Sequence, residues 1–122
     1  TIHETERTPE IKLLISEGLF SIKGESFPED VAAFYGQIIA SIDSLKGSLS
    51  KTLRVEIALV YTNSSSIKAL YRIFEGFEAI RKSGGKVDIT WFFQEDDDIM
   101  EELGEDFHDR FPELGIKVTG QQ

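Results

Sequence analysis

The sequence predicts an α/β fold with the element order ββαβαβαβ, in which helices pack against a mixed, mostly parallel sheet. Short apolar runs alternate with segments of helical period from residue 29 onward, a pattern typical of right-handed β-α-β units with parallel strands. Before that point, two short apolar runs surround a turn that contains Gly18, which predicts an antiparallel hairpin at one edge of the sheet. The length of 122 residues suits one domain. We therefore expect a single domain over residues 11–119, preceded by a flexible, polar N-terminal segment over residues 1–10.

The hairpin and the first helix account for the first part of this domain. The runs "IKLLI" and "LFSIKG" predict the two strands. Pro28, followed by Glu29 and Asp30, is suited to the first turn of a helix. The helix carries one broad apolar stripe of helical spacing, which consists of Val31, Phe34, Tyr35, Ile38, Ile39, Ile42 and Leu45. We expect this stripe to face the core along its whole length.

Three strands and two helices follow. Residues 53–61, "LRVEIALVY", alternate at first and are then apolar throughout, which predicts a central strand covered on both faces. A second helix starts after "TNSSS" and ends at "SGG", where glycine can take the left-handed cap conformation. "KVDITWFF" predicts a third inner strand, residues 96–110 a third helix, and "GIKV" the last strand.

Composition and charge exclude several functions. The chain has no cysteine, which excludes disulfides and thiolate chemistry and agrees with a cytoplasmic location. No apolar run approaches the roughly 20 residues of a spanning helix, so we expect no membrane partner. The net charge is −9, and ten acidic residues against one Arg lie between Glu95 and Glu113. Because nucleic-acid affinity comes largely from Lys and Arg, we expect no nucleic-acid partner either. The acidic helix has two open interpretations, a docking surface or a contribution to solubility.

Catalytic and ligand-binding motifs are not evident. A nucleophilic serine needs a base, but the only histidines are His3 in the N-terminal segment and His108 in the acidic helix. The calcium-loop pattern counted from Asp96 fails, because Met100 and Glu101 stand where an oxygen ligand and a glycine are required. "KSGGK" is too short for a phosphate-binding loop and follows a helix instead of preceding one. We therefore expect no catalytic residue, no metal and no cofactor.

The segment "YTNSSSIK", which joins the central strand to the second helix, is the most distinctive motif. Asn and Ser are favoured N-cap residues because their side-chain oxygens accept hydrogen bonds from the first helical turn. One cap explains one residue and leaves the other hydroxyl groups unexplained. In a doubly wound sheet, this junction is also where sites preferentially occur. A phosphate added here would place about −1.5 to −2 charges at the positive end of a helix dipole.

The sequence resembles the bacterial SiaC-type regulatory phosphoproteins, which are similar in fold to the anti-sigma-factor antagonists (STAS domains). The resemblance covers about residues 11–118 and is carried by "SFPED", "FYGQII", "LVYTNSSSIKAL" and "IFEGFE". Its most specific part is a tyrosine, one variable residue, asparagine, three hydroxyl residues, a hydrophobic residue and a basic residue. These positions are occupied here by Tyr61, Asn63, Ser64, Ser65, Ser66, Ile67 and Lys68.

The resemblance implies a non-enzymatic partner switch. A cognate serine/threonine protein kinase phosphorylates the hydroxyl residue directly after the asparagine, which is Ser64 here, with Ser65 as second choice. A PP2C-type phosphatase removes the phosphate, and the unphosphorylated form binds and activates a diguanylate cyclase, which raises cyclic di-GMP and favours biofilm or aggregation. The expected partner-binding residues are Asn63, Ser65, Ser66, Lys68 and Arg72. Two alternatives stay open: an anti-sigma-factor antagonist with the same phosphoswitch, and a small enzyme or ligand-binding domain with a pocket near residues 61–68.

Overall fold

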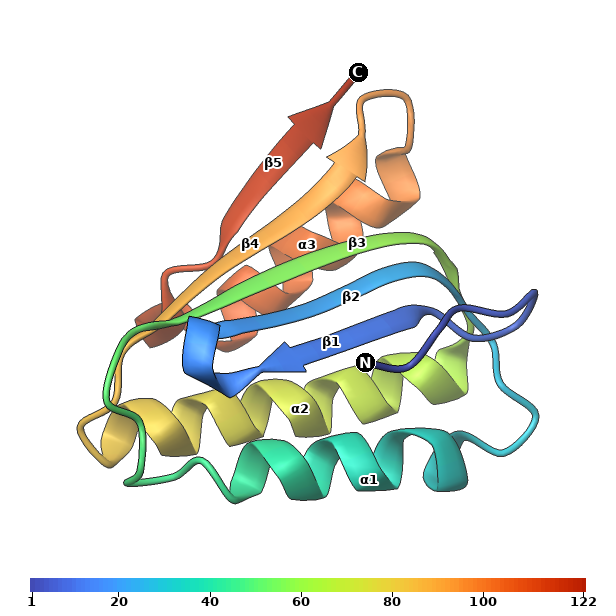
Figure 1. Cartoon of the computed structure of the whole chain (residues 1–122). Coiled ribbons are helices and arrows are strands. Elements are labelled where there is room, and N and C mark those ends of the chain that lie inside the picture. The colour runs from blue at the N-terminus through green and yellow to red at the C-terminus, as the bar shows by residue number, and fades with distance from the viewer.

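The strands of the sheet lie in space in the same order as in the sequence. The computed structural model describes all 122 residues and has a single sheet in the order β1-β2-β3-β4-β5 (Figure 1). The strands are β1 (Glu10–Leu14), β2 (Leu19–Ser26), β3 (Leu53–Thr62), β4 (Val87–Gln94) and β5 (Lys117–Gln121). The helices are α1 (Val31–Asp43), α2 (Ser64–Lys82) and α3 (Asp98–Arg110), with short 3₁₀ turns η1 (Ile15–Glu17) and η2 (Pro112–Leu114). The α/β class and the predicted ββαβαβαβ order are therefore confirmed.

The N-terminal hairpin forms the antiparallel edge of the sheet. β1 and β2 pair antiparallel, whereas the pairs β2-β3, β3-β4 and β4-β5 are parallel. Gly18 closes η1 with φ of 66°, a left-handed conformation that favours glycine. Residues 1–10, for which the sequence predicts a flexible segment, make backbone contacts with the sheet. Ile2 and Ile11 exchange two backbone hydrogen bonds of 2.7 and 2.9 Å.

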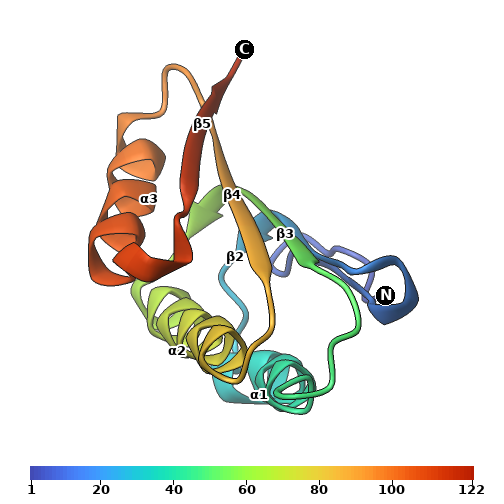
Figure 2. The same ribbon diagram turned by 90° about the vertical axis from the view of Figure 1, so that its left-hand side faces the viewer.

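All three helices lie on one face of the sheet, which corrects the prediction that β3 is covered on both faces (Figure 2). The right-handed β-α-β connections advance in one direction from β2 to β5, so each helix returns across the same face. Covering the second face would require a reversal of strand order, as in a doubly wound sheet. Side chains of β3 therefore alternate: Leu53, Val55, Ile57 and Leu59 are buried, whereas Glu56 lies on the open face. On that face, the Glu56 carboxylate lies 3.6 Å from Nζ of Lys23 in β2.

The helix α1 begins directly after the Pro-Glu-Asp motif, which was expected in its first turn. Asp30 is the N-cap, and its carboxylate accepts a hydrogen bond of 3.0 Å from the backbone N–H of Ala33. Glu29 lies before the helix and pairs with Arg7 at 2.8 Å. The predicted apolar stripe is confirmed. Its members are buried or partly buried against one core cluster.

The helix α3 is held against β4 by an aromatic contact that depends on a glycine. Trp91 of β4 is fully buried and donates a hydrogen bond of 3.0 Å from Nε1 to the backbone carbonyl of Met100. A Cβ on Gly104 would lie 2.5 Å from Cδ1 of Trp91, so only glycine permits this close approach. Phe74 of α2 stacks on Phe107 of α3 with ring centroids 4.6 Å apart, which joins the two helices.

Candidate functional site

Asn63, and not one of the serines, caps the helix α2. Its side-chain Oδ1 accepts a hydrogen bond of 2.9 Å from the backbone N–H of Ser66. Its backbone carbonyl accepts the first helical hydrogen bond, from Ile67, at 3.0 Å. Of the cap candidates that the sequence offered, Asn and Ser, the structure assigns the cap to Asn63, and the helix begins earlier than predicted, at Ser64. Ser64 and Ser65 instead occupy its first two positions, where backbone N–H groups have no acceptor within the helix.

The three serines differ in exposure. Ser64 and Ser65 are exposed, whereas Ser66 is fully buried. Ser26 Oγ donates a hydrogen bond of 3.0 Å to Ser66 Oγ and is itself bonded to the hydroxyl of Tyr35. Burial raises the pKa of Tyr35, and the hydrogen bond to Ser26 acts in the opposite direction. The partner-binding role of Ser66 stays a prediction, but its hydroxyl is internal and links α2 to β2 and α1.

The two predicted basic residues of α2 have different surroundings. Lys68 is exposed and makes no ion pair, and it lies one helical turn after Ser64 on the same side of the helix. Arg72 is exposed as well, but its guanidinium donates a hydrogen bond of 2.7 Å to the carboxylate of Asp43 at the end of α1. A phosphate on Ser64 would therefore find Lys68 as the nearest free cation along the helix, while Arg72 serves the contact between α1 and α2.

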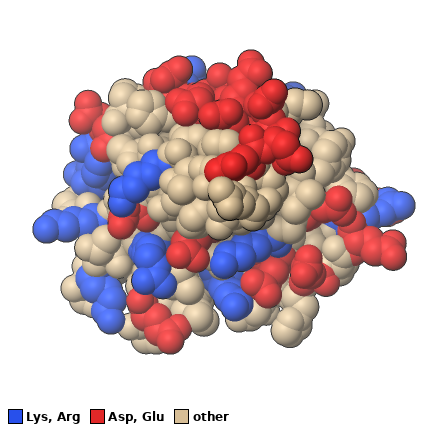
Figure 3. Space-filling model, turned by 90° about the horizontal axis from the view of Figure 1, so that it is seen from above, with Lys and Arg blue, Asp and Glu red and all other residues tan.

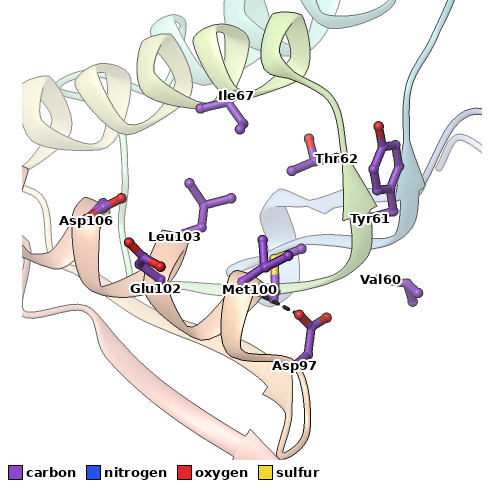
Figure 4. Close-up of a pocket in the computed structure, with 10 residues that line it drawn as sticks. Val60, Tyr61, Thr62, Ile67, Asp97, Met100, Glu102, Leu103 and Asp106 are labelled. Carbon is purple, nitrogen blue, oxygen red and sulfur yellow. Dashed lines mark hydrogen bonds between the residues drawn. The ribbon is translucent and has the colours of Figure 1, made fainter.

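A cleft opens between the end of β3, the start of α2 and the helix α3. One alternative from the sequence had placed a pocket near residues 61–68, but the contribution of α3 was not predicted. The pairing of β3 with β2 continues to Thr62, but its pairing with β4 stops at Ala58. The last four residues of β3 therefore have no partner in β4. The resulting cleft has a volume of about 360 Å³, and the side chains of Ile67 and Leu103 face one another across it (Figure 4).

The lining of the cleft is apolar with acidic residues and no basic residue. Its apolar members are Val60, Tyr61, Ile67, Ile99, Met100 and Leu103. The acidic members are Asp97, Glu102 and Asp106. The carboxylate of Asp97 accepts a hydrogen bond of 3.0 Å from the Met100 N–H as the cap of α3, whereas Glu102 and Asp106 form no ion pair. Viewed from above, acidic side chains gather along one margin of the molecule, and basic and acidic side chains mix over the opposite half (Figure 3).

The chemistry available at this site is limited. The structure has no group of three or more His, Cys, Asp or Glu residues that could hold a metal ion. No histidine, lysine or arginine lines the cleft, so it offers no imidazole base and no cation for an anionic ligand. The pocket near residues 61–68 that an enzyme or ligand-binding domain would need is thus present in part: it is apolar, but its polar groups are mainly carboxylates. None of the helices is both long enough and apolar enough to span a bilayer.

Exposed hydroxyl groups at a helix start, beside a cleft with exposed apolar side chains, suit a regulatory domain that protein partners bind. Comparison with known proteins agrees with this class: residues 2–121 match the model of the SiaC family regulatory phosphoproteins. The chain belongs to this family.

Individual relatives extend the comparison. An uncharacterised protein of Pseudomonas aeruginosa (strain UCBPP-PA14) is 30% identical over 105 residues, covering 86% of this chain and 83% of the relative. The apo-SiaC crystal structure from Pseudomonas aeruginosa is 28% identical, with a TM-score of 0.83 and coverage of 99% of this chain and 96% of that one. SiaC in complex with the diguanylate cyclase SiaD, which it activates, superposes with a TM-score of 0.86 at 26% identity and coverage of 97% and 96%.

Proposed function

We propose that this protein is a non-enzymatic switch in which the phosphorylation state of Ser64 decides whether it binds and activates a diguanylate cyclase. The observation that carries the proposal is the position of Ser64: it is exposed, directly follows the capping Asn63 and is the first residue of α2. A hydroxyl group there is accessible to a protein kinase. The relative that was crystallised with a diguanylate cyclase supports the choice of effector over an anti-sigma factor.

The local structure also supports reversible phosphorylation at this position. A dianionic phosphate is stabilised near the first N–H groups of a helix, because these are unpaired and carry partial positive charge. Lys68 adds a cation one turn further on. Both forms of the protein are therefore compatible with the same helix, and the change is confined to the surface offered to partners. A cytoplasmic serine/threonine kinase and a PP2C-type phosphatase complete the cycle.

Ser65 is the second candidate acceptor. It is exposed like Ser64 and lies at the next helical position, so accessibility alone does not separate the two. The order Ser64 before Ser65 rests on the family motif, in which the acceptor directly follows the asparagine. Asn63 shapes the turn that presents both residues.

Mass spectrometry tests the proposal. The full chain is incubated with its cognate kinase and ATP, and the phosphate is located by peptide fragmentation in the natural sequence and in the Ser64→Ala and Ser65→Ala variants. We expect one phosphate on Ser64, retained in Ser65→Ala and lost in Ser64→Ala. A phosphate on Ser65 in the natural sequence would show that Ser65, and not Ser64, is the phosphorylated residue. Cyclic di-GMP production by the cognate cyclase is measured with both forms, and equal activation would contradict the switch.

A further inference from the structure

We propose that the cleft between β3, α2 and α3 is the docking surface for a partner segment that carries apolar side chains flanked by Lys or Arg. This proposal adds a docking surface to the proposed function. Only the assignment of the partner segment to the effector cyclase rests on that function. The proposal also decides between the two interpretations of the acidic helix in favour of docking. Two residues of the family motif, Tyr61 and Ile67, line this cleft, whereas Lys68 and Arg72 do not.

Exposed apolar side chains are concentrated at this site. The protein has four exposed large hydrophobic residues, and three of them line the cleft. These are Ile99, Val60 and Tyr61, with exposed fractions of 80%, 63% and 51%. The fourth, Ile15, lies in the hairpin turn at β1. Single exposed hydrophobic residues are ordinary, but a group around a concave surface marks an interaction site.

The backbone explains why these residues are covered so little within the chain, where Tyr61 packs edge-on against Phe27, with ring centroids 5.7 Å apart. β4 leaves β3 after Ala58, so Val60 and Tyr61 extend beyond the part of the sheet where β4 is a neighbour. α3 starts at Asp98 and places Ile99 in its first turn, opposite the end of β3 across the cleft. Both elements thus present apolar side chains to a space that no other segment of the chain fills. A partner that occupies it would remove these side chains from water, which is favourable at about 25 cal/mol per Å² of apolar area.

The charges around the cleft indicate what kind of partner fits. Glu102 and Asp106 line it without any ion pair, and no basic residue of the protein lines it. Of the ten acidic residues between Glu95 and Glu113, only Asp109 contacts a basic group, His108, at 3.4 Å. An acidic partner would meet this field with like charge, whereas Lys and Arg are attracted to it and steered into place. The partner segment is therefore cationic at its margins and apolar at its centre.

The cleft is also placed where modification of Ser64 can act on it. Ile67, one helical turn after Ser64, contributes to its wall. A phosphate at this edge attracts cations, but it must retain its hydration shell. A partner side chain that packs on Ile67 would have to displace water from this dianion, and this desolvation opposes docking, whereas the charge of the phosphate by itself attracts the Lys or Arg of the partner. We infer weaker effector docking after phosphorylation because the desolvation cost exceeds this added attraction.

Two synthetic peptides test the chemistry of the cleft. They share the same spaced leucines, and one carries lysines at the margins where the other carries glutamates. Each is titrated into the unphosphorylated full chain, and methyl NMR signals are followed. We expect the lysine peptide to shift the methyl signals of Ile67, Ile99 and Leu103 in a saturable way, and the glutamate peptide to leave them in place. Equal responses to both peptides, no binding, or largest shifts outside the cleft would overturn the proposal.

Matched variants separate the cleft from the general acidity of the protein. Ile99→Ser should weaken lysine-peptide binding about tenfold, whereas Ile15→Ser, at another exposed isoleucine that lies outside the cleft, should not change it. Glu102→Lys should weaken binding more than Glu105→Lys, although both change the net charge by the same amount and both sites are exposed. Equal weakening by the two charge variants would indicate non-specific attraction and reject the site.

The outcomes for the cleft and for the phosphoswitch are distinguishable. If Ser64 is never phosphorylated or the cyclase does not respond, the proposed function fails while the peptide titration still reports on the cleft. If the lysine peptide does not bind in the cleft, the docking surface is rejected, and the phosphorylation result at Ser64 still stands.

Discussion

At the residue scale, the buried hydroxyl of Ser66 determines how the start of α2 is attached. Ser66 Oγ accepts the hydrogen bond of Ser26, which is bonded in turn to Tyr35, so one polar chain joins α2, β2 and α1 in the core. We predict that Ser66→Ala lowers the free energy of unfolding by about 1–3 kcal/mol, because it leaves a buried donor without its acceptor. Chemical denaturation followed by fluorescence of Trp91 measures this effect. An unchanged midpoint would show that Ser26 finds another acceptor.

Thr62, four residues before Ser66, has a buried hydroxyl that is unpaired. Its Oγ1 is buried and has no hydrogen-bond partner. Replacement by valine keeps the shape of the side chain and removes this unpaired polar atom. We expect Thr62→Val to raise the free energy of unfolding by about 1 kcal/mol, in the same denaturation experiment. A loss of stability would indicate that the hydroxyl is paired in solution.

At the scale of elements, two of the three helical glycines, Gly36 and Gly104, lead to opposite predictions. A Cβ at Gly36 in α1 meets nothing within 4 Å, so Gly36→Ala should stabilise the protein by about 1 kcal/mol through helix propensity. A Cβ at Gly104 in α3 would collide with the Trp91 ring, so Gly104→Ala should destabilise it by about 1–3 kcal/mol. Thermal unfolding of both variants measures the difference. Equal stability of the two would mean that α3 can move away from β4 without cost.

The helix α1 and the strand β3 show which parts of the fold could be predicted from the sequence. The helix α1 was predictable because seven apolar residues repeat at helical spacing, and this local pattern does not depend on the rest of the fold. The apolar end of β3 was predicted to be buried on both faces, but Val60 and Tyr61 are exposed. Their exposure depends on where β4 separates from β3, which is a long-range property that no local pattern records. An apolar run that continues past the length of its neighbours is the signal that could have indicated the cleft.

The same limit applies to the site at the start of α2. Exposed hydroxyl groups beside a capping residue could be predicted from "TNSSS", because N-cap chemistry is local. The burial of Ser66 depends on Ser26 and Tyr35, which lie 40 and 31 positions earlier in the chain. Likewise, the ion pair of Arg72 depends on Asp43 in α1. The sequence motif therefore locates the segment, and tertiary contacts decide which of its residues remain available to partners.

At the scale of the whole molecule, effector binding should respond to the charge on Ser64 through the adjoining cleft. We predict that Ser64→Asp weakens binding of the cognate cyclase about tenfold, because the cost of desolvating a carboxylate one turn from the apolar wall at Ile67 exceeds its attraction for the Lys or Arg of the partner. Ser64→Asn is the matched control, since it has nearly the same size without the charge and should bind as the natural sequence does. Isothermal titration calorimetry with the unphosphorylated chain measures both. Equal affinities of the Asp and Asn variants would assign the switch to the size of the modification and not to its charge.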